Sequence, residues 1–284
     1  MVIKPCTAAE VTFYETCVAS HPEFAALLPT FFGTLQLNDP AAPPGGNLQP
    51  SSTTAPATHN RHTNIVLSNI AYGFTHPCIL DVKLGAQLWD EAASAEKRAR
   101  LDAVSNSTTS GSLGFRVAGM RVYKGVAALD AHPAIDGTGY RAYDKHYGRV
   151  FTAENVIDAL REYFTSEISP DQVRLVVERF RRKVDEIKTV LENQESRMYS
   201  ASLLFCYEGG ARAFEDALKE EAKQELRAGE EEEKEEEGEE GDEKVAAVKL
   251  IDFAHASWTP GLGPDENALQ GVRSIEKLLK QFCC

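Results

Sequence analysis

Hydrophobic and polar positions along the chain follow two periods. Short apolar runs with every second residue polar predict strands, whereas apolar residues that recur every three or four positions predict helices. We expect strands at about residues 2–4, 31–37, 64–71, 77–84, 115–124, 200–207 and 248–252. We expect helices at about residues 8–20, 92–104, 153–164, 171–193 and 211–227, and a final helix that Asp265 can cap.

The order of these elements divides the chain into two parts of unequal size. Residues 1–75 hold a few strands and one helix, interrupted at about 38–63 by a stretch rich in Pro, Gly, Asn, Ser and Thr. We expect this stretch to be a flexible loop. Residues 76–284 hold the remaining elements. Strands and helices mixed in this order predict an α+β fold with a small N-lobe and a larger C-lobe.

The net charge of −13 is concentrated in one segment. Residues 229–243 contain eleven acids and one lysine, which leaves the rest of the chain close to neutral. Such a block cannot bury apolar area, so we expect a disordered acidic insert at about 228–244. It is either a solvated insertion or a docking site for basic nuclear proteins. The near-neutral remainder does not exclude an anionic substrate, and the lack of an extended basic patch argues against direct nucleic-acid binding.

Cysteine usage and hydropathy indicate a protein of the cytosol or nucleus. The six cysteines, at 6, 17, 78, 206, 283 and 284, fit no zinc-binding pattern and are expected to be reduced thiols. No apolar run approaches the roughly 20 residues that a membrane helix needs. The first residues also lack the apolar centre of a signal peptide.

An acid and a base stand two positions apart in the apolar run from Pro77 to Gly85. Asp81 and Lys83 therefore share one face of the predicted strand. A charged pair in an apolar strand costs desolvation energy unless something binds there. Phosphate chemistry could use the lysine to neutralise phosphate oxygens and the aspartate to hold a hydroxyl or a metal. The alternative is a surface ion pair on an edge strand.

A second apolar run also ends in an acid. Asp252 follows Val248–Ile251 and precedes the aromatic Phe253. A carboxylate at a strand end is a common way to present a magnesium ligand to a nucleotide. Between the two acids, Ser202-Leu203-Leu204 lies in a run that is typical of a buried strand.

These three segments, in this order, resemble the signature of the inositol polyphosphate kinase family: Pro77 to Gly85, Ser202 to Leu204 and Ile251 to Phe253. The resemblance extends over nearly the whole chain. It implies a two-lobed kinase-like fold with an ATP-binding cleft between the lobes. The Asp265-Glu266-Asn267 sequence and the acidic insert favour the multikinase branch found in fungi.

The resemblance assigns a nucleotide side to the site. Lys4 would reach the ATP phosphates, with Glu10 as its partner, and Asp252 would hold Mg2+. Asp81 would also lie beside the nucleotide. The adenine hinge is implied at Ser68, Asn69 and Ile70. The family has a strand hairpin ahead of this lysine, and the sequence begins three residues before it, so either the sequence is truncated or the hairpin is missing.

The resemblance also assigns an acceptor side. Asp81 would act on the accepting hydroxyl, as a base or a positioning group, and Lys83 would stabilise charge on the phosphate. The segment at about 86–104 would bind inositol phosphate, and Lys97 and Arg100 share a helix face within it. The alternative there is a solvated charged face. The implied substrate-binding residues are Lys83, Lys97, Arg98, Arg100, Lys145 and His255.

The implied activity is an ATP- and Mg2+-dependent transfer to inositol trisphosphate, giving tetrakis- and pentakisphosphates by direct in-line displacement. Two alternatives remain: an inositol hexakisphosphate kinase that makes pyrophosphates, and a non-catalytic transcriptional scaffold. The family further implies a monomer of the nucleus and cytoplasm.

Overall fold

The computed structural model describes residues 1–36, 63–128, 134–231 and 245–282. The expected loop at 38–63 lies outside the described residues except for Thr63, which begins a strand. Most of the expected acidic insert, residues 232–244, also lies outside them. Its first residues, 228–231, continue a helix instead of being disordered.

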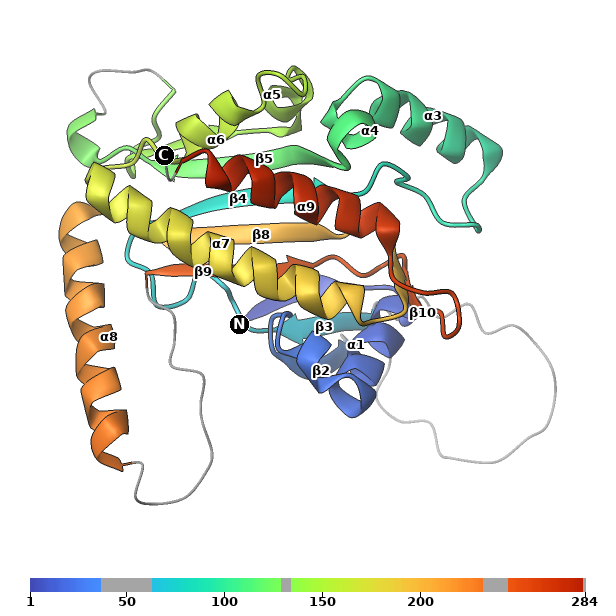
Figure 1. The fold of residues 1–284 in the computed structure, drawn as a ribbon, viewed down its shortest axis with the longest axis horizontal. Helices are drawn as coiled ribbons and strands as arrows, with labels where there is room; N and C mark the ends of the chain where they lie inside the picture. The colour runs from blue at the N-terminus through green and yellow to red at the C-terminus, as the bar shows by residue number, and fades with distance from the viewer. Residues whose placement is uncertain (37–62, 129–133, 232–244, 283–284) are drawn as a thin grey trace, which may run out of the picture.

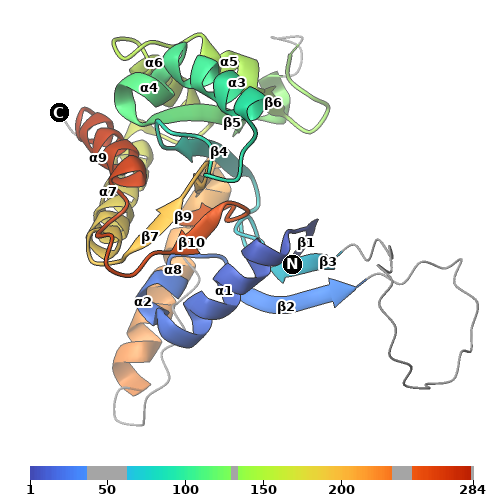
Figure 2. The ribbon, with the colours of Figure 1, turned by 90° about the vertical axis from the view of Figure 1, so that its right-hand side faces the viewer.

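The small lobe is a three-stranded antiparallel sheet with one long helix packed beside it (Figure 2). The strand order is β1-β3-β2, which makes β1 an edge strand. The elements are β1 (Val2–Pro5), α1 (Ala8–Ser20), α2 (Pro22–Ala25), β2 (Phe31–Gln36) and β3 (Thr63–Leu67). The expected strand at 64–71 therefore ends earlier, because Ser68 begins the turn that leads into the large lobe.

The large lobe is built on a five-stranded antiparallel sheet of order β6-β5-β4-β8-β9 (Figure 1). Its strands are β4 (Pro77–Leu84), β5 (Phe115–Tyr123), β6 (Tyr140–Tyr143), β8 (Ser202–Glu208) and β9 (Ala246–Ile251). Two short strands, β7 (Ser196–Met198) and β10 (Ala256–Trp258), pair separately. Because β4 is the central strand, the interpretation of Asp81 and Lys83 as an edge-strand surface pair is wrong.

Helices surround this sheet. They are α3 (Ala95–Asn106), α4 (Thr109–Leu113), α5 (Lys145–Arg149), α6 (Ile157–Tyr163), α7 (Pro170–Glu192), α8 (Ala211–Glu231) and α9 (Glu266–Lys280), with a 3-10 turn at Val126–Ala128. The helix expected from residue 92 begins at Ala95, because the Ser94 side chain caps it. Within the described ranges, no helix combines the length and apolarity needed to cross a membrane.

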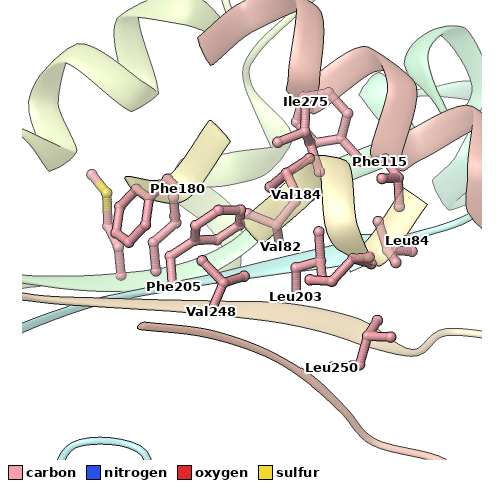
Figure 3. Packing of buried hydrophobic residues seen from close by; sticks show 14 of the residues in the cluster. Val82, Leu84, Phe115, Phe180, Val184, Leu203, Phe205, Val248, Leu250 and Ile275 are labelled. Carbon is pink, nitrogen blue, oxygen red and sulfur yellow. The ribbon is translucent and has the colours of Figure 1, made fainter. Parts of the chain in front are cut away.

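The core lies between the large sheet and the pair α7 and α9, which cross one face of it (Figure 1). Side chains of β4 alternate strictly, so that Leu80, Val82 and Leu84 are buried on this face. They belong to one buried cluster with Phe180 and Val184 of α7, part of which is drawn in Figure 3. Apolar burial of this kind stabilises the fold by about 1.5–3 kcal/mol per large side chain. The alternation leaves Asp81 and Lys83 on the opposite face.

The start of α9 fixes the turn after β4. Asp265 caps α9 by accepting the Ala268 amide at 3.1 Å, as expected, and it also accepts the Met198 amide at 2.6 Å. The next residue but one, Asn267, accepts the amides of Ala86 at 2.9 Å and Gln87 at 2.8 Å. These bonds fix the two residues that follow Gly85. Gly85 itself has a φ of +94°, which favours glycine.

Replacing Gly85 with alanine should destabilise the protein more than the same change at Gly73. Both glycines have nearly the same φ, +94° and +93°. A Cβ at Gly85 would lie 2.5 Å from Nδ2 of Asn267, whereas a Cβ at Gly73 meets nothing within 4 Å. Urea unfolding should show a loss of about 1 kcal/mol for Gly73→Ala and about 2–3 kcal/mol for Gly85→Ala. Equal losses would contradict the steric role of Asn267.

Candidate functional site

One ion pair joins the two lobes at the site. Nζ of Lys4, on β1, lies 2.8 Å from Oδ1 of Asp252, which follows β9. The same ammonium lies 2.9 Å from Oε1 of Glu10, on α1. Burial acts to lower the pKa of Lys4, but the contacts with the two carboxylates outweigh it, so the pKa is raised. Lys4 is therefore held as a cation between two acids.

Asp252 is presented by a strained turn. Its φ is +68°, in the left-handed region that non-glycine residues seldom adopt. The next residue, Phe253, is fully buried and stacks on Phe13 of α1 at 4.9 Å between ring centroids. This aromatic anchor fixes the turn, while the Asp252 side chain remains 45% exposed. An exposed carboxylate on a fixed turn is suited to bind a ligand from outside the protein.

Asp81 and Lys83 lie on the face of β4 opposite α7 and α9. The sheet register places Arg116 of β5 on one side of Lys83 and Ser202 of β8 on the other. Residues paired in this way share one face. Oδ1 of Asp81 and Oγ of Ser202 are both buried, and neither forms a well-aligned hydrogen bond in the described part of the chain. The Ser202 hydroxyl is nevertheless close enough to Asp81 to lower the pKa of its carboxyl. A buried polar atom without a partner marks a place where a ligand can supply one.

Burial moves the pKa values of these two groups toward each other. It raises the pKa of the Asp81 carboxyl, and the Ser202 hydroxyl and the Lys83 ammonium oppose that shift. Burial also lowers the pKa of the Lys83 ammonium, against the attraction of Asp81 and Asp252. Perturbed acid and base groups side by side are typical of a functional site.

Lys83 is anchored on a second strained residue. Its Nζ donates to the carbonyl of Ser200 at 2.6 Å, and Ser200 has a φ of +62°. The Ser200 hydroxyl donates to the carbonyl of Leu88 at 3.0 Å. Ser200 thus connects the central strand to the loop that precedes α3.

His255 completes the site beside this loop. Its Nδ1 lies 2.6 Å from Oδ2 of Asp90, and its Nε2 lies 3.4 Å from Nζ of Lys97 on α3. The Tyr199 amide, next to Ser200, donates to the His255 carbonyl at 3.2 Å. Residues 199 and 200 therefore connect Lys83 on β4 with His255.

The sequence model of the family described as "Inositol polyphosphate kinase" matches residues 64–280. The chain belongs to this family. It is 35% identical to the inositol polyphosphate multikinase of Saccharomyces cerevisiae, over 77% of this chain and 68% of the relative. It is 30% identical to that of Schizosaccharomyces pombe, over 97% and 87% of the two chains. Human inositol hexakisphosphate kinase 1 is 30% identical, but the match covers 52% of that protein.

The fold is shared with a solved member of the inositol polyphosphate kinase family. The crystal structure of the inositol phosphate multikinase Ipk2 of S. cerevisiae, in complex with ADP and Mn2+, matches with a TM-score of 0.74 and 31% identity. The match covers 99% of this chain and 98% of that one. The expected two-lobed kinase-like α+β fold is confirmed.

Not every residue assigned by the family resemblance lies at this cluster. The Arg98 guanidinium stacks on the Trp89 ring at 4.6 Å and donates to the carbonyls of Ala93 and Glu91. Arg98 therefore braces the loop before α3. Arg100 on α3 and Lys145 at the start of α5 are exposed to solvent. Their assignment as substrate contacts stays a prediction.

The hinge residues form the turn after β3. The Ser68 amide donates to the Thr30 carbonyl at 2.9 Å, so this group is already engaged. The Asn69 side chain accepts the Ala71 amide at 3.1 Å. The Ser68 carbonyl and the Ile70 amide form no backbone hydrogen bond within the described residues. These two backbone groups are therefore available to a ligand, and their assignment to adenine stays a prediction.

A metal at this site would depend on few protein ligands. Within the ranges that the structure describes, no three His, Cys, Asp or Glu side chains are grouped to hold an ion. Magnesium-like ions are commonly bound by one or two carboxylates together with nucleotide phosphates. Asp252 fits this pattern, because it offers one accessible carboxylate at the junction of the lobes.

Three residues at the site were missed from the sequence, namely Asp90, Ser200 and Arg116, and so was the effect of Ser202 on Asp81. Ser202 was expected only as part of a buried strand, and its hydroxyl also opposes the rise in the pKa of Asp81. Arg116 becomes a neighbour of Lys83 only through strand register, which no local pattern reveals. The Trp89-Asp90 pair before the basic helix was a usable signal, because an acid there can face the cations that follow.

Removing Lys4 should destabilise the protein because Glu10 would lose its cation. Glu10 is only 2% exposed, and an unpaired buried carboxylate costs about 2–3 kcal/mol. Chemical denaturation should show this loss for Lys4→Met and a smaller one for Lys4→Met with Glu10→Gln. Arg174→Met is the control, since the Arg174–Asp171 pair is exposed and should contribute less than about 0.5 kcal/mol. A Lys4→Met loss no larger than the control would contradict the pairing.

Proposed function

We propose that this protein transfers the γ-phosphoryl group of ATP to hydroxyls of inositol phosphates, as an inositol polyphosphate multikinase. Inositol trisphosphate and tetrakisphosphate are the proposed acceptors, giving tetrakis- and pentakisphosphates. One observation carries the proposal. The Lys4–Asp252 pair, which suits a nucleotide, lies close to the Asp81–Lys83 pair, which suits an acceptor. The contact between His255 and Lys97 lies beside them.

On the nucleotide side, adenine lies against the turn at Ser68–Ile70 and the phosphates extend toward Lys4. The relative of known structure holds ADP and Mn2+, which supports ATP and a divalent ion for this chain. Mg2+ is the ion that we propose, held by Asp252. When bound, the ion neutralises charge on the nucleotide phosphates. In this scheme Lys4 exchanges its contact with Asp252 for one with a phosphate oxygen.

On the acceptor side, Asp81 orients the attacking hydroxyl and Lys83 stabilises the phosphoryl group. The hydroxyl oxygen forms a bond to the γ-phosphorus as the bond to the β–γ bridging oxygen breaks, and the hydroxyl proton passes to Asp81. A loose transition state for this transfer requires mainly positioning and charge stabilisation. No covalent intermediate on the protein is involved.

Further substrate phosphates are bound by cations around the loop and helix at 86–104. Lys97 and His255 are already in contact. Arg100 and Lys145 are exposed cations that we place at the edge of the same site. Arg98 has a supporting role in this scheme, because its donors are used within the loop.

Two other assignments accompany the activity. We propose that the enzyme is a monomer of the nucleus and cytoplasm, as the family resemblance implies. We also propose that the acidic segment at 229–243 docks basic nuclear proteins, since eleven acids in fifteen residues form a strong local charge for such partners.

The activity is tested by incubating the full chain with radiolabelled ATP and either inositol 1,4,5-trisphosphate or inositol hexakisphosphate. Label on the trisphosphate that is lost in Asp252→Asn is the expected result. Label on the hexakisphosphate alone would instead indicate a pyrophosphate-forming enzyme. Label on neither acceptor, from a protein with a normal unfolding transition, would leave the scaffold alternative.

The pH dependence of kcat/KM should be bell-shaped and narrow. Activity requires ionised Asp81, so it is lost on the acidic side as pH falls through the raised pKa of that carboxyl. Activity also requires protonated Lys83, so it is lost on the alkaline side as pH rises through the lowered pKa of that ammonium. Ser202→Ala removes a group that lowers the Asp81 pKa, so the acidic limb should move to higher pH while the alkaline limb stays. A pH–rate profile measures both limbs, and an unmoved acidic limb would contradict the role of Ser202.

A further inference from the structure

His255 is engaged at both ring nitrogens by residues from two other segments. Asp90 comes from the loop after β4, and its Oδ2 lies 2.6 Å from Nδ1. Lys97 comes from α3, and its Nζ lies 3.4 Å from Nε2. The His255 side chain is 37% exposed and that of Asp90 25%. The ring can therefore be reached by a ligand while its far side is held.

Asp90 and Lys97 favour the same tautomer of the His255 ring, the one with hydrogen on Nδ1. An ammonium has only donors, so Nε2 must accept from Lys97. A carboxylate has only acceptors, so Nδ1 must carry the hydrogen and donate it to Asp90. This arrangement resembles the carboxylate–histidine pairs in which the outer carboxylate fixes the orientation and tautomer of a working imidazole.

The loop that carries Asp90 is braced before any substrate arrives. The Leu88 carbonyl accepts the Ser200 hydroxyl at 3.0 Å. Nε1 of Trp89 donates to Oδ1 of Asp102 at 2.6 Å, and Arg98 stacks on the Trp89 ring. Asp90 is therefore fixed in place by both of its preceding neighbours. Such pre-ordering reduces the entropy lost when a ligand binds.

We infer that Asp90 is a positioning residue for substrate binding: it holds His255 so that Nε2 and the Lys97 ammonium face one phosphate group of the inositol phosphate. This inference rests on the proposed function. When the phosphate binds, Lys97 exchanges its contact with Nε2 for a phosphate oxygen. A protonated oxygen of the same phosphate group then donates to Nε2. The carboxylate of Asp90 keeps the ring in this tautomer, because Nδ1 donates to it throughout.

Kinetics with a double-mutant cycle test the inference. Asp90→Ala should raise the KM for inositol trisphosphate about tenfold or more, with kcat and the KM for ATP within about twofold. In a His255→Ala background the same change should add less than about twofold, because its target is gone. Asp90→Asn keeps an acceptor for Nδ1 and should fall between wild type and Asp90→Ala. An undiminished Asp90→Ala effect without His255 would overturn the inference.

Asp102→Ala is the matched control. Asp102 is the other carboxylate that holds this segment, but it contacts Trp89 and not His255. Because Asp102 acts on His255 only through the loop, the change in KM that it causes should couple to His255→Ala much less strongly than that of Asp90→Ala. A cycle in which Asp102 couples to His255 as strongly as Asp90 does would show loop integrity rather than a specific contact, and would also overturn the inference.

A readout independent of activity separates this inference from the proposed function. Nitrogen-15 NMR of the imidazole should show wild-type His255 with hydrogen on Nδ1 alone, and Asp90→Ala with a mixture of tautomers. Identical spectra for the two proteins would overturn the positioning role even if the kinase is active. The expected spectra from a protein that phosphorylates no inositol phosphate would count against the proposed function alone.

Discussion

Strand β4 satisfies two opposing demands, and the rest of the site depends on how it does so. Its even positions bury Leu80, Val82 and Leu84 in the core, while its odd positions carry Asp81 and Lys83. A central strand cannot expose those charges fully, so both are half-buried and their pKa values are shifted by burial. A one-residue shift of β4 would place both charged side chains in the core and greatly increase their desolvation cost. This cost prevents the strand from slipping. The register that protects the core therefore also fixes the two charged groups.

Backbone strain at the site occurs at the two residues that present charged groups or bind them. Within the described residues, the two non-glycine positions with positive φ are Ser200 and Asp252. Each costs roughly 1 kcal/mol or more, and each is held by a neighbour that packs firmly. Phe253 anchors Asp252 in the aromatic cluster, and the Ser200 hydroxyl is bound by Leu88. Because core packing holds the turn at Asp252 and a hydrogen bond holds Ser200, the Lys83 anchor and the carboxylate of Asp252 are in place without a ligand.

Local patterns predicted the elements but not the contacts between them. The alternation in β4 and the capping residue Asp265 could be read directly, because strand period and helix caps are local properties. Short elements such as α2, α4 and β10 were missed, since three to five residues carry too little periodicity. Lys4, Asp81 and Asp252 were singled out by residue type and by the family resemblance. Asp90 was not, because its partner His255 is 165 positions away and only the fold brings them together. The same reason explains why Arg98 was assigned to substrate: its stacking on Trp89 depends on the path of the loop.

The Lys4–Asp252 contact has a further consequence for how the two lobes are held. In this state the Lys4 ammonium is paired with the Asp252 carboxylate across the junction. The buried Glu10 carboxylate contacts the same ammonium from within the small lobe. A nucleotide with its metal ion would give each group a new partner of opposite charge. The exchange replaces one ion pair with two, so the junction need not bear an unpaired charge at either stage. Because Asp252 is partly exposed and Glu10 is buried, Asp252 is the partner that Lys4 can release at low cost. Lys4 would thus remain attached to the small lobe through Glu10 while it turns toward the phosphates.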